Sequence, residues 1–124
     1  MILGIGIDVV HVNRMRRWRD VPGLFERFFN PVELEDAQQR KSSEVLSLAA
    51  RFAAKEAFGK ALGTGLRGLT LKEILIRNNH NGKPEIRFFG KAAAAFERIG
   101  GKKVFISLTH EKDNAIAVVV IEGE

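Results

Sequence analysis

Two carboxylates and one lysine stand out as residues whose types and spacing could do chemistry. The stretch RFAAKEAFGKALGTG, residues 51–65, holds a single carboxylate, Glu56, four positions after Phe52 and four before Lys60. Residues four apart share one face of a helix, so these three side chains would point the same way. The second carboxylate, Asp8, belongs to the N-terminal segment GIGIDVV.

Together these residues could form a site for a hard cation. Mg²⁺ prefers oxygen ligands, usually one or two carboxylates with waters and substrate phosphate, and a nearby Lys60 could meet another phosphate oxygen. The alternative is an ordinary surface pair of Glu56 and Lys60, worth about 0.3–0.5 kcal/mol. Residue types alone favour the surface pair, because the sequence gives no distance between Asp8 and Glu56.

The glycines before Asp8 bear on the same question. Gly4, Gly6 and Asp8 occupy alternate positions, so one face of a strand here would carry no side chain until the carboxylate appears. Such a face leaves room for a ligand beside Asp8, or it allows a helix to pack closely. His110, at the end of SLTH, is a lone histidine of the kind that usually faces solvent.

The densest positive cluster is NRMRRWRD, residues 13–20. A helix capped by Asn13 would bring Arg14, Arg17 and Trp18 to neighbouring positions of one face. This face is either solvated or a docking surface for an acidic partner, with Met15 and Trp18 as an apolar anchor.

Length and composition indicate one intracellular domain spanning residues 1–124. The chain has 124 residues, no cysteine and a formal net charge of +5, which favours an anionic partner. The absence of cysteine fits a reducing cytoplasm. No basic leader and no membrane-length apolar run is present, so we expect a cytoplasmic protein without a membrane partner.

The order of elements predicts an α+β fold, with a mostly antiparallel sheet packed on one long helix and several short ones. We expect a strand at residues 2–12, then helices at 13–20 and 22–29. A third helix would begin at NPVE, where Asn30 caps, Pro31 takes the first helical position and Glu33 completes a capping box.

The long helix would run over residues 43–62 and end at Gly63 and Gly65. Asn-Gly in HNGK predicts a hairpin with a type I′ turn, and KVFISLTH with AIAVVVIE predicts another around EKDN. A small helix, GKAAAAFERIG, would lie between them. AIAVVVI is apolar on both faces, so a helix would cover one face and a symmetric partner protomer could cover the other.

The chain resembles the holo-[acyl-carrier-protein] synthase family of 4′-phosphopantetheinyl transferases in four segments: GIGIDVV, RFAAKEAFGKALGTG, NGKP and SLTH. These segments follow one another in the same order as in the family and extend across nearly the whole chain. The resemblance implies a Mg²⁺-dependent enzyme of fatty acid and lipid biosynthesis. Such an enzyme moves the 4′-phosphopantetheine arm of coenzyme A to a serine of apo acyl carrier protein and releases adenosine 3′,5′-bisphosphate. It also implies a compact α+β fold and a homotrimer with active sites between protomers.

The resemblance also implies residue roles. Asp8 and Glu56 match the family's metal ligands, and Lys60 matches the lysine that meets the pyrophosphate. Two further groups of residues would bind coenzyme A: the glycines that follow the long helix, Gly63 and Gly65, and the SLTH residues Ser107, Thr109 and His110. The acidic carrier would dock on Arg14, Arg17 and Trp18. The base that takes the serine proton stays open among Glu56, Asp8 and a metal-bound water.

The main alternative is a basic nucleic-acid-binding module that would use the same arginines against phosphates. Single-strand binders stack bases on exposed aromatic side chains, whereas the nine Phe and absent Tyr of this chain are typical of a core. We therefore expect no nucleic acid partner.

Overall fold

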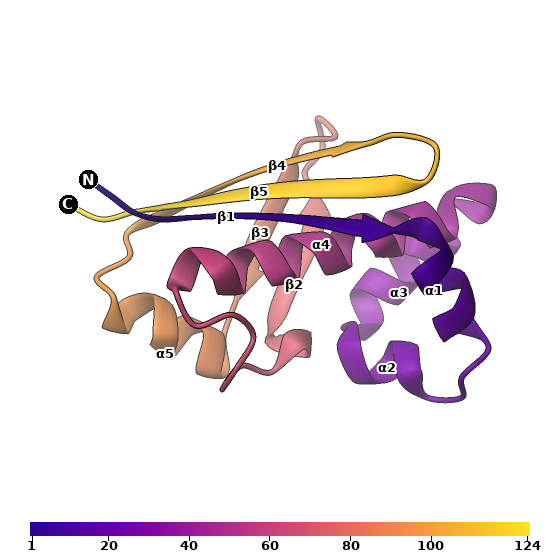
Figure 1. Cartoon of the computed structure of the whole chain (residues 1–124), viewed down its shortest axis with the longest axis horizontal. Helices are drawn as coiled ribbons and strands as arrows, with labels where there is room; N and C mark the ends of the chain where they lie inside the picture. Colours follow the sequence, from indigo (N-terminus) through magenta and orange to yellow (C-terminus); the bar gives the residue numbers. More distant parts are fainter.

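The protein is an antiparallel sheet laid along one long helix. A computed structural model describes all residues, 1–124, and confirms the predicted α+β fold (Figure 1). In chain order the elements are β1 Ile2–His11, α1 Val12–Arg19, α2 Leu24–Phe28, α3 Pro31–Gln38, η1 Lys41–Ser43, α4 Glu44–Leu62, η2 Leu71–Glu73, β2 Ile74–Asn78, β3 Pro84–Phe88, α5 Gly90–Arg98, β4 Lys103–His110 and β5 Asn114–Glu122. Membrane crossing would require a longer and more apolar helix than any of these.

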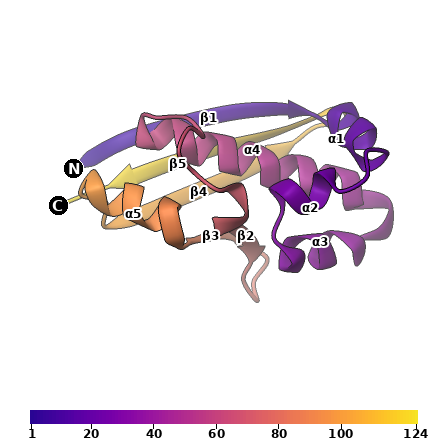
Figure 2. The same cartoon turned by 90° about the horizontal axis from the view of Figure 1, so that it is seen from below.

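Two separate sheets contact α4. The main sheet has the order β1-β5-β4 and is antiparallel throughout, while β2 and β3 form a hairpin of their own. Figure 1 shows the main sheet running along α4, with the chain termini side by side. Figure 2 shows α1, α2 and α3 around one end of α4 and α5 near the other.

Helix α4 is the central element because its sequence is apolar and small on most sides. Its buried residues include the alanines 49, 53, 54, 57 and 61 and the large side chains of Leu48, Phe52 and Phe58. A helix that is apolar around most of its surface must be covered by other elements, and here it is covered by the sheet, the hairpin and the short helices. Gly63 ends α4 with a φ of 89°, as its position predicts.

The glycine face of β1 is filled by α4, so the idea of ligand space beside Asp8 on that face is wrong. A Cβ atom at Gly4 would overlap the carbonyl oxygen of Ala61, and one at Gly6 would overlap that of Ala57. Only hydrogen at these positions lets the strand approach the helix backbone this closely. The glycines therefore fix the distance between β1 and α4.

Most predicted boundaries are confirmed, and two local details are wrong. Asn30 and Glu33 form the predicted capping box, with Pro31 in the first turn. Helix α1, however, is capped by His11, whose Nδ1 accepts a hydrogen bond from the backbone N–H of Asn13. The type I′ turn is also wrong, because such a turn needs a positive φ at two central residues, whereas the β2–β3 loop, residues 79–83, has one only at Gly82, 82°. The side chain of Asn79 organises this loop by accepting two backbone hydrogen bonds.

Strand β5 has two different apolar faces. Alanine and branched residues at alternate positions 115, 117, 119 and 121 are buried, whereas 116, 118 and 120 are half-buried. The half-buried face continues onto β1 and β4, where Ile5, Ile7, Val9 and Phe105 are more than half exposed. The sheet therefore presents an exposed apolar outer face in a single chain, as the sequence predicted for β5.

The contact between β1 and α4 gives a stability prediction. Gly6→Ala should destabilise the fold by about 1–3 kcal/mol or more, because the new methyl group must push the strand away from the carbonyl of Ala57. Thermal unfolding monitored by circular dichroism measures this change. Ile2→Ala, at an exposed position of the same strand, is the matched control and should unfold near the wild-type temperature. A Gly6→Ala protein as stable as this control would contradict the close-packing argument.

Candidate active site

The fold brings Asp8, Glu56 and Lys60 together at the β1 edge of the sheet. Lys60 donates hydrogen bonds from Nζ to Oδ1 of Asp8 and to the carbonyl oxygen of Ile7, both at 3.0 Å. The Asp8 side chain is 17% exposed and that of Lys60 is 51% exposed, so the pair lies at the boundary of the core and solvent. Two of the three ammonium donors are used, which leaves one for a ligand.

The environment of Glu56 shows that the charge of Asp8 reaches it. Partial burial is the first cause that raises the pKa of Glu56, and the charge of Asp8 raises it further. Arg14 and then Lys60 oppose this rise. Two neighbouring carboxylates in a partly desolvated place are a suitable donor set for a hard divalent cation.

The donor set fits Mg²⁺ better than a metal that needs a complete protein cage. No group of three or more His, Cys, Asp or Glu side chains converges anywhere in the chain. Mg²⁺ commonly keeps several waters and takes only one or two carboxylates together with substrate phosphate. Asp8 and Glu56 therefore supply what such a site requires.

The basic helix α1 lies next to this centre. The guanidinium carbon of Arg14 lies 5.1 Å from the ring centroids of both Trp18 and Phe52, so two aromatic faces hold the cation. Trp18 also packs against Phe28, with the centroids 5.1 Å apart. Arg17 is exposed, whereas Met15 is fully buried. The expectation that Met15 adds to a docking surface is therefore wrong.

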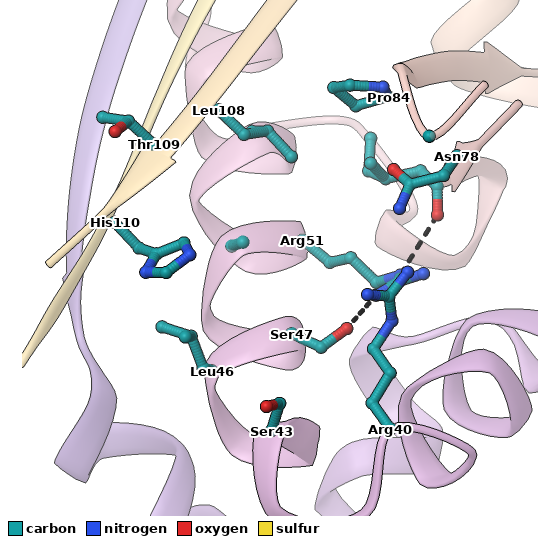
Figure 3. A pocket seen from close by; sticks show the side chains of 13 residues that line it. Arg40, Ser43, Leu46, Ser47, Arg51, Asn78, Pro84, Leu108, Thr109 and His110 are labelled. Atoms are coloured by element: carbon teal, nitrogen blue, oxygen red, sulfur yellow. Dashed lines mark hydrogen bonds between the residues drawn. The ribbon is translucent and has the colours of Figure 1, made fainter. Parts of the chain in front are cut away.

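A second candidate site is a pocket of about 410 Å³ on the other side of α4 (Figure 3). It lies between α4, the β2–β3 hairpin and the end of β4. Its lining residues are Arg40, Ser43, Leu46, Ser47, Ala50, Arg51, Ile76, Asn78, Gly82, Pro84, Leu108, Thr109 and His110.

Positive and hydroxyl groups dominate the polar part of this pocket. Figure 3 shows Arg40, from the turn after α3, Arg51, from α4, and His110, from the end of β4, directed into it. Arg51 donates through Nε to the carbonyl oxygen of Ile76 at 3.1 Å and through another nitrogen to the Ser47 hydroxyl. Its nearest carboxylate oxygen, from Asp36, is 3.7 Å away. Such a cavity suits an anionic ligand with a ring-sized body.

The structure brings some expected coenzyme A residues to this pocket and leaves others away from it. Thr109 and His110 line it. Ser107 is exposed and is not among the lining residues. Gly63 and Gly65 lie beyond Lys60 at the far end of α4, where the backbone N–H of Gly65 donates to the carbonyl of Gly59.

Sequence reasoning assigned no role to several pocket residues. Arg40, Arg51, Asn78, Gly82 and Pro84 all line the cavity. NGKP, which contains the last two, was used only as a family motif, and Arg51 opens the helical stretch that contains Glu56. Only the spatial convergence of the hairpin, α4 and β4 shows that these residues belong to one site.

The two sites occupy opposite faces of α4. Ser47 and Glu56 are nine positions apart, as are Arg51 and Lys60, and nine residues are about two and a half helical turns. The carboxylate centre is next to β1, the pocket is next to β4, and these strands are the two edges of the main sheet. A ligand bound to one chain cannot contact both sites without passing around the helix.

The raised pKa of Glu56 predicts a pH-dependent effect on stability. The folded state disfavours the charged form of Glu56, so ionisation of this side chain destabilises the fold. This destabilisation is absent below the ordinary pKa of 4.5 and grows as the pH rises through the higher pKa of Glu56 in the folded protein. In the presence of a chelator, Glu56→Gln should therefore unfold at a higher temperature than the wild type at pH 8, and the difference should vanish near pH 4. Glu97→Gln, at an exposed site on α5, is the control without such a difference. An unchanged or lower unfolding temperature of Glu56→Gln at pH 8 would refute the assigned electrostatics.

Comparison with known proteins shows the family of the chain. Residues 4–119 match the 4′-phosphopantetheinyl transferase superfamily. The holo-[acyl-carrier-protein] synthase of Treponema denticola is 53% identical over 99% of this chain and 100% of its own length, and that of Treponema pallidum is 46% identical over 100% of this chain and 98% of its own.

Solved structures give the same result. The holo-[acyl-carrier-protein] synthase of Neisseria meningitidis superposes with a TM-score of 0.89 at 38% identity, covering 98% of this chain and 99% of its own. The synthase of Bacillus anthracis in complex with coenzyme A (3′,5′-ADP) has a TM-score of 0.84 at 35% identity, covering 100% and 99%. The chain therefore belongs to the 4′-phosphopantetheinyl transferase superfamily, and within it to the holo-[acyl-carrier-protein] synthase enzymes.

Proposed function

We propose that this enzyme transfers the 4′-phosphopantetheine group from coenzyme A to a serine of apo acyl carrier protein in a Mg²⁺-dependent reaction. The products are the holo carrier protein, which serves fatty acid and lipid biosynthesis, and adenosine 3′,5′-bisphosphate. The convergence of Asp8, Glu56 and Lys60 carries the proposal, since two carboxylates and an ammonium suit the positioning and charge neutralisation that phosphoryl transfer needs.

Each residue of the centre has a distinct role in this reaction. Asp8 and Glu56 would hold Mg²⁺, which supplies charge neutralisation and orientation at the pyrophosphate. Lys60 donates to the same pyrophosphate, because its exposed ammonium can turn from Asp8 toward a phosphate oxygen. The proton of the serine hydroxyl would pass to one of these two carboxylates or to a metal-bound water.

The nucleotide end of coenzyme A would occupy the pocket lined by Arg40, Arg51 and His110. These groups match the phosphates, and the apolar walls, which include Leu108 and Pro84, match the adenine ring. Because this pocket and the carboxylate centre lie on opposite faces of α4, one coenzyme A would span two chains. The pocket of one protomer would then complete the centre of its neighbour.

A ring of three protomers supplies this geometry. The β1 edge of one chain must meet the β4 edge of the next, which is a head-to-tail contact that closes into a ring. The exposed outer face of the sheet, with Ile5, Ile7 and Val9 on β1 and Phe105 on β4, is the apolar surface that such a contact would bury. We therefore propose a homotrimer with its active sites between protomers.

The acidic carrier protein would dock on α1. Arg14, already held between Trp18 and Phe52, loses little side-chain freedom on binding a carboxylate, and Arg17 adds a second exposed cation. Trp18 offers a partly exposed apolar surface beside them. Since Arg14 also acts on the charge of Glu56, this docking surface is adjacent to the reacting groups.

The reaction itself can be tested by mass spectrometry. The protein incubated with coenzyme A, Mg²⁺ and apo acyl carrier protein should yield a carrier heavier by one phosphopantetheine group, with an equal amount of adenosine 3′,5′-bisphosphate. Chelation of the metal, Asp8→Ala or Glu56→Ala should abolish the transfer while the fold is retained, because removal of either carboxylate destroys the cation site. A carrier without its acceptor serine should gain no mass. Unmodified carriers after long incubation would refute the proposed function.

The shared active site can be tested with two inactive variants. Asp8→Ala removes the carboxylate centre, and His110→Glu places a negative charge in the nucleotide pocket. If each site combines two chains, random mixing by co-expression should restore about a quarter of wild-type activity, because one intact centre then meets one intact pocket in a quarter of the contacts. If both parts came from one chain, no mixture would contain an intact site, and activity would stay at the level of the separate variants.

A further inference from the structure

A buried ion pair joins α3 to α4 through Glu33 and Lys55, the residue before Glu56. Lys55 and Glu33 are both 0% exposed, and Nζ of Lys55 lies 2.6 Å from Oε1 of Glu33. Burial lowers the pKa of Lys55, and the charge of Glu33 opposes this change. An ion pair removed this completely from water costs more desolvation energy than a surface pair, so an apolar pair of similar size would fill the space at less cost.

The hydrogen bonds of the pair show what the charges provide. Beyond Glu33, Nζ of Lys55 donates to the carbonyl oxygens of Leu71 at 2.8 Å and Ile74 at 2.7 Å. Oε2 of Glu33 accepts from the backbone N–H of Ile76 at 3.1 Å. All three ammonium donors are therefore used, and two of the acceptors belong to the backbone just before and within β2.

These contacts satisfy the free edge of β2. The hairpin has only two strands, and no strand of the main sheet is hydrogen-bonded to it. On the side away from β3, the backbone groups of β2 find side-chain partners instead: Lys55 for Ile74, and Glu33 and Arg51 for Ile76. Buried backbone groups need such partners, and three charged side chains here take the place of a neighbouring strand.

The same hairpin forms one wall of the nucleotide pocket. Asn78 ends β2, and Gly82 and Pro84 lie in and after its loop, while the opposite walls come from α4 and β4. Arg51 belongs to both systems, since it lines the pocket and donates to Ile76. The bonds that hold β2 against α4 therefore contribute to the width of the pocket.

We propose that Glu33 and Lys55 are positioning residues that place the β2–β3 wall of the pocket and so determine its affinity for the nucleotide of coenzyme A. The inference rests on the proposed function, because it takes the pocket as the nucleotide site. The proposal predicts different effects on coenzyme A affinity and on kcat. Loss of the pair should loosen the pocket wall and lower the affinity, while Asp8, Glu56 and Lys60 keep their places on the other face of α4. A pair that served only stability would leave affinity unchanged in every variant that still folds.

The test compares a double variant with a control that is destabilised elsewhere in the fold. Glu33→Met combined with Lys55→Met removes both charges and keeps apolar volume, so the fold has the best prospect of surviving. Ile121→Ala, in a fully buried position at the end of the sheet away from His110, lowers stability without touching the hairpin. The conservative variant Glu33→Gln keeps the shape of the side chain but has one acceptor oxygen in place of two. With that oxygen toward Lys55, its NH2 group faces the N–H of Ile76 and cannot accept from it. This variant serves if the double variant does not fold.

Three quantities are measured on the assembled protein: the dissociation constant for coenzyme A by calorimetry, kcat at saturating coenzyme A, and hydrogen exchange of the Ile76 amide by NMR. In the double variant and in Glu33→Gln, we expect the dissociation constant to rise by roughly tenfold, as for the loss of one or two hydrogen bonds. We expect kcat to stay within about twofold, and exchange at Ile76 to become faster. Ile121→Ala should change none of these three quantities beyond its general loss of stability.

Two results would overturn the proposal. One is a folded variant in which Ile76 exchanges faster but coenzyme A binds as in the wild type. The other is an equal loss of affinity in Ile121→Ala, which would mean that lower stability alone weakens binding. Failure of the proposed function can be distinguished from failure of this proposal. If the proposed function is wrong, the wild-type protein itself binds no coenzyme A. Exchange at Ile76 then still reports whether the ion pair holds the edge of β2.

Discussion

The site depends on the contact between the glycine face of β1 and the backbone of α4. Gly4 and Gly6 leave no space for a methyl group against the carbonyls of Ala61 and Ala57. Asp8 is the next residue on the same face of the strand, so the approach that the glycines allow brings its carboxylate within hydrogen-bonding distance of Lys60. A bulkier strand would sit farther from the helix, and the carboxylates of Asp8 and Glu56 would belong to separate surfaces.

The opposite side of α4 is held by a different kind of interaction. Where β1 and β5 pack through glycine and alanine, the hairpin β2–β3 is attached through Glu33, Arg51 and Lys55, whose charged groups reach its backbone. Apolar packing is tolerant of small sliding movements, whereas hydrogen bonds to defined carbonyls and amides fix a position along the strand. The wall of the pocket is thus located by direction-dependent contacts, and the reaction centre is located by close packing.

The sequence predicted those parts of the fold that local chemistry determines. The capping box at Asn30, the end of α4 at Gly63 and the two hairpins follow from residues close together in the chain, and each is confirmed. The turn type of the first hairpin and the cap of α1 were wrong, because the side chains of Asn79 and His11 supply hydrogen bonds that propensity rules do not include.

The site was predictable only in part, for a related reason. Asp8, Glu56 and Lys60 were singled out because spacing places two of them on one helix face and because alternate glycines lead to the third, and the family resemblance then implied their roles. The pocket could not be found in this way, since Arg40, Arg51, Asn78 and His110 come from four segments whose meeting depends on the tertiary fold. Lys55 and Glu56 are adjacent charged residues, yet Lys55 is enclosed in the core and Glu56 lies beside Asp8. Residue type alone does not reveal this difference in burial.

The separation of the two sites has an electrostatic consequence. Arg14 and Lys60 already oppose the raised pKa of Glu56, and Lys60 pairs with Asp8. If Arg40 and Arg51 also faced these carboxylates within one chain, the guanidinium groups would pair with the carboxylates directly. The proposed metal ligands and the proposed phosphate-binding groups would then bind one another in place of the metal and the phosphates. Placing the cations across the helix keeps the two charge types apart. In the proposed assembly they meet only across a protomer boundary, where the phosphates of a bound coenzyme A lie between them and supply the charge that each side lacks.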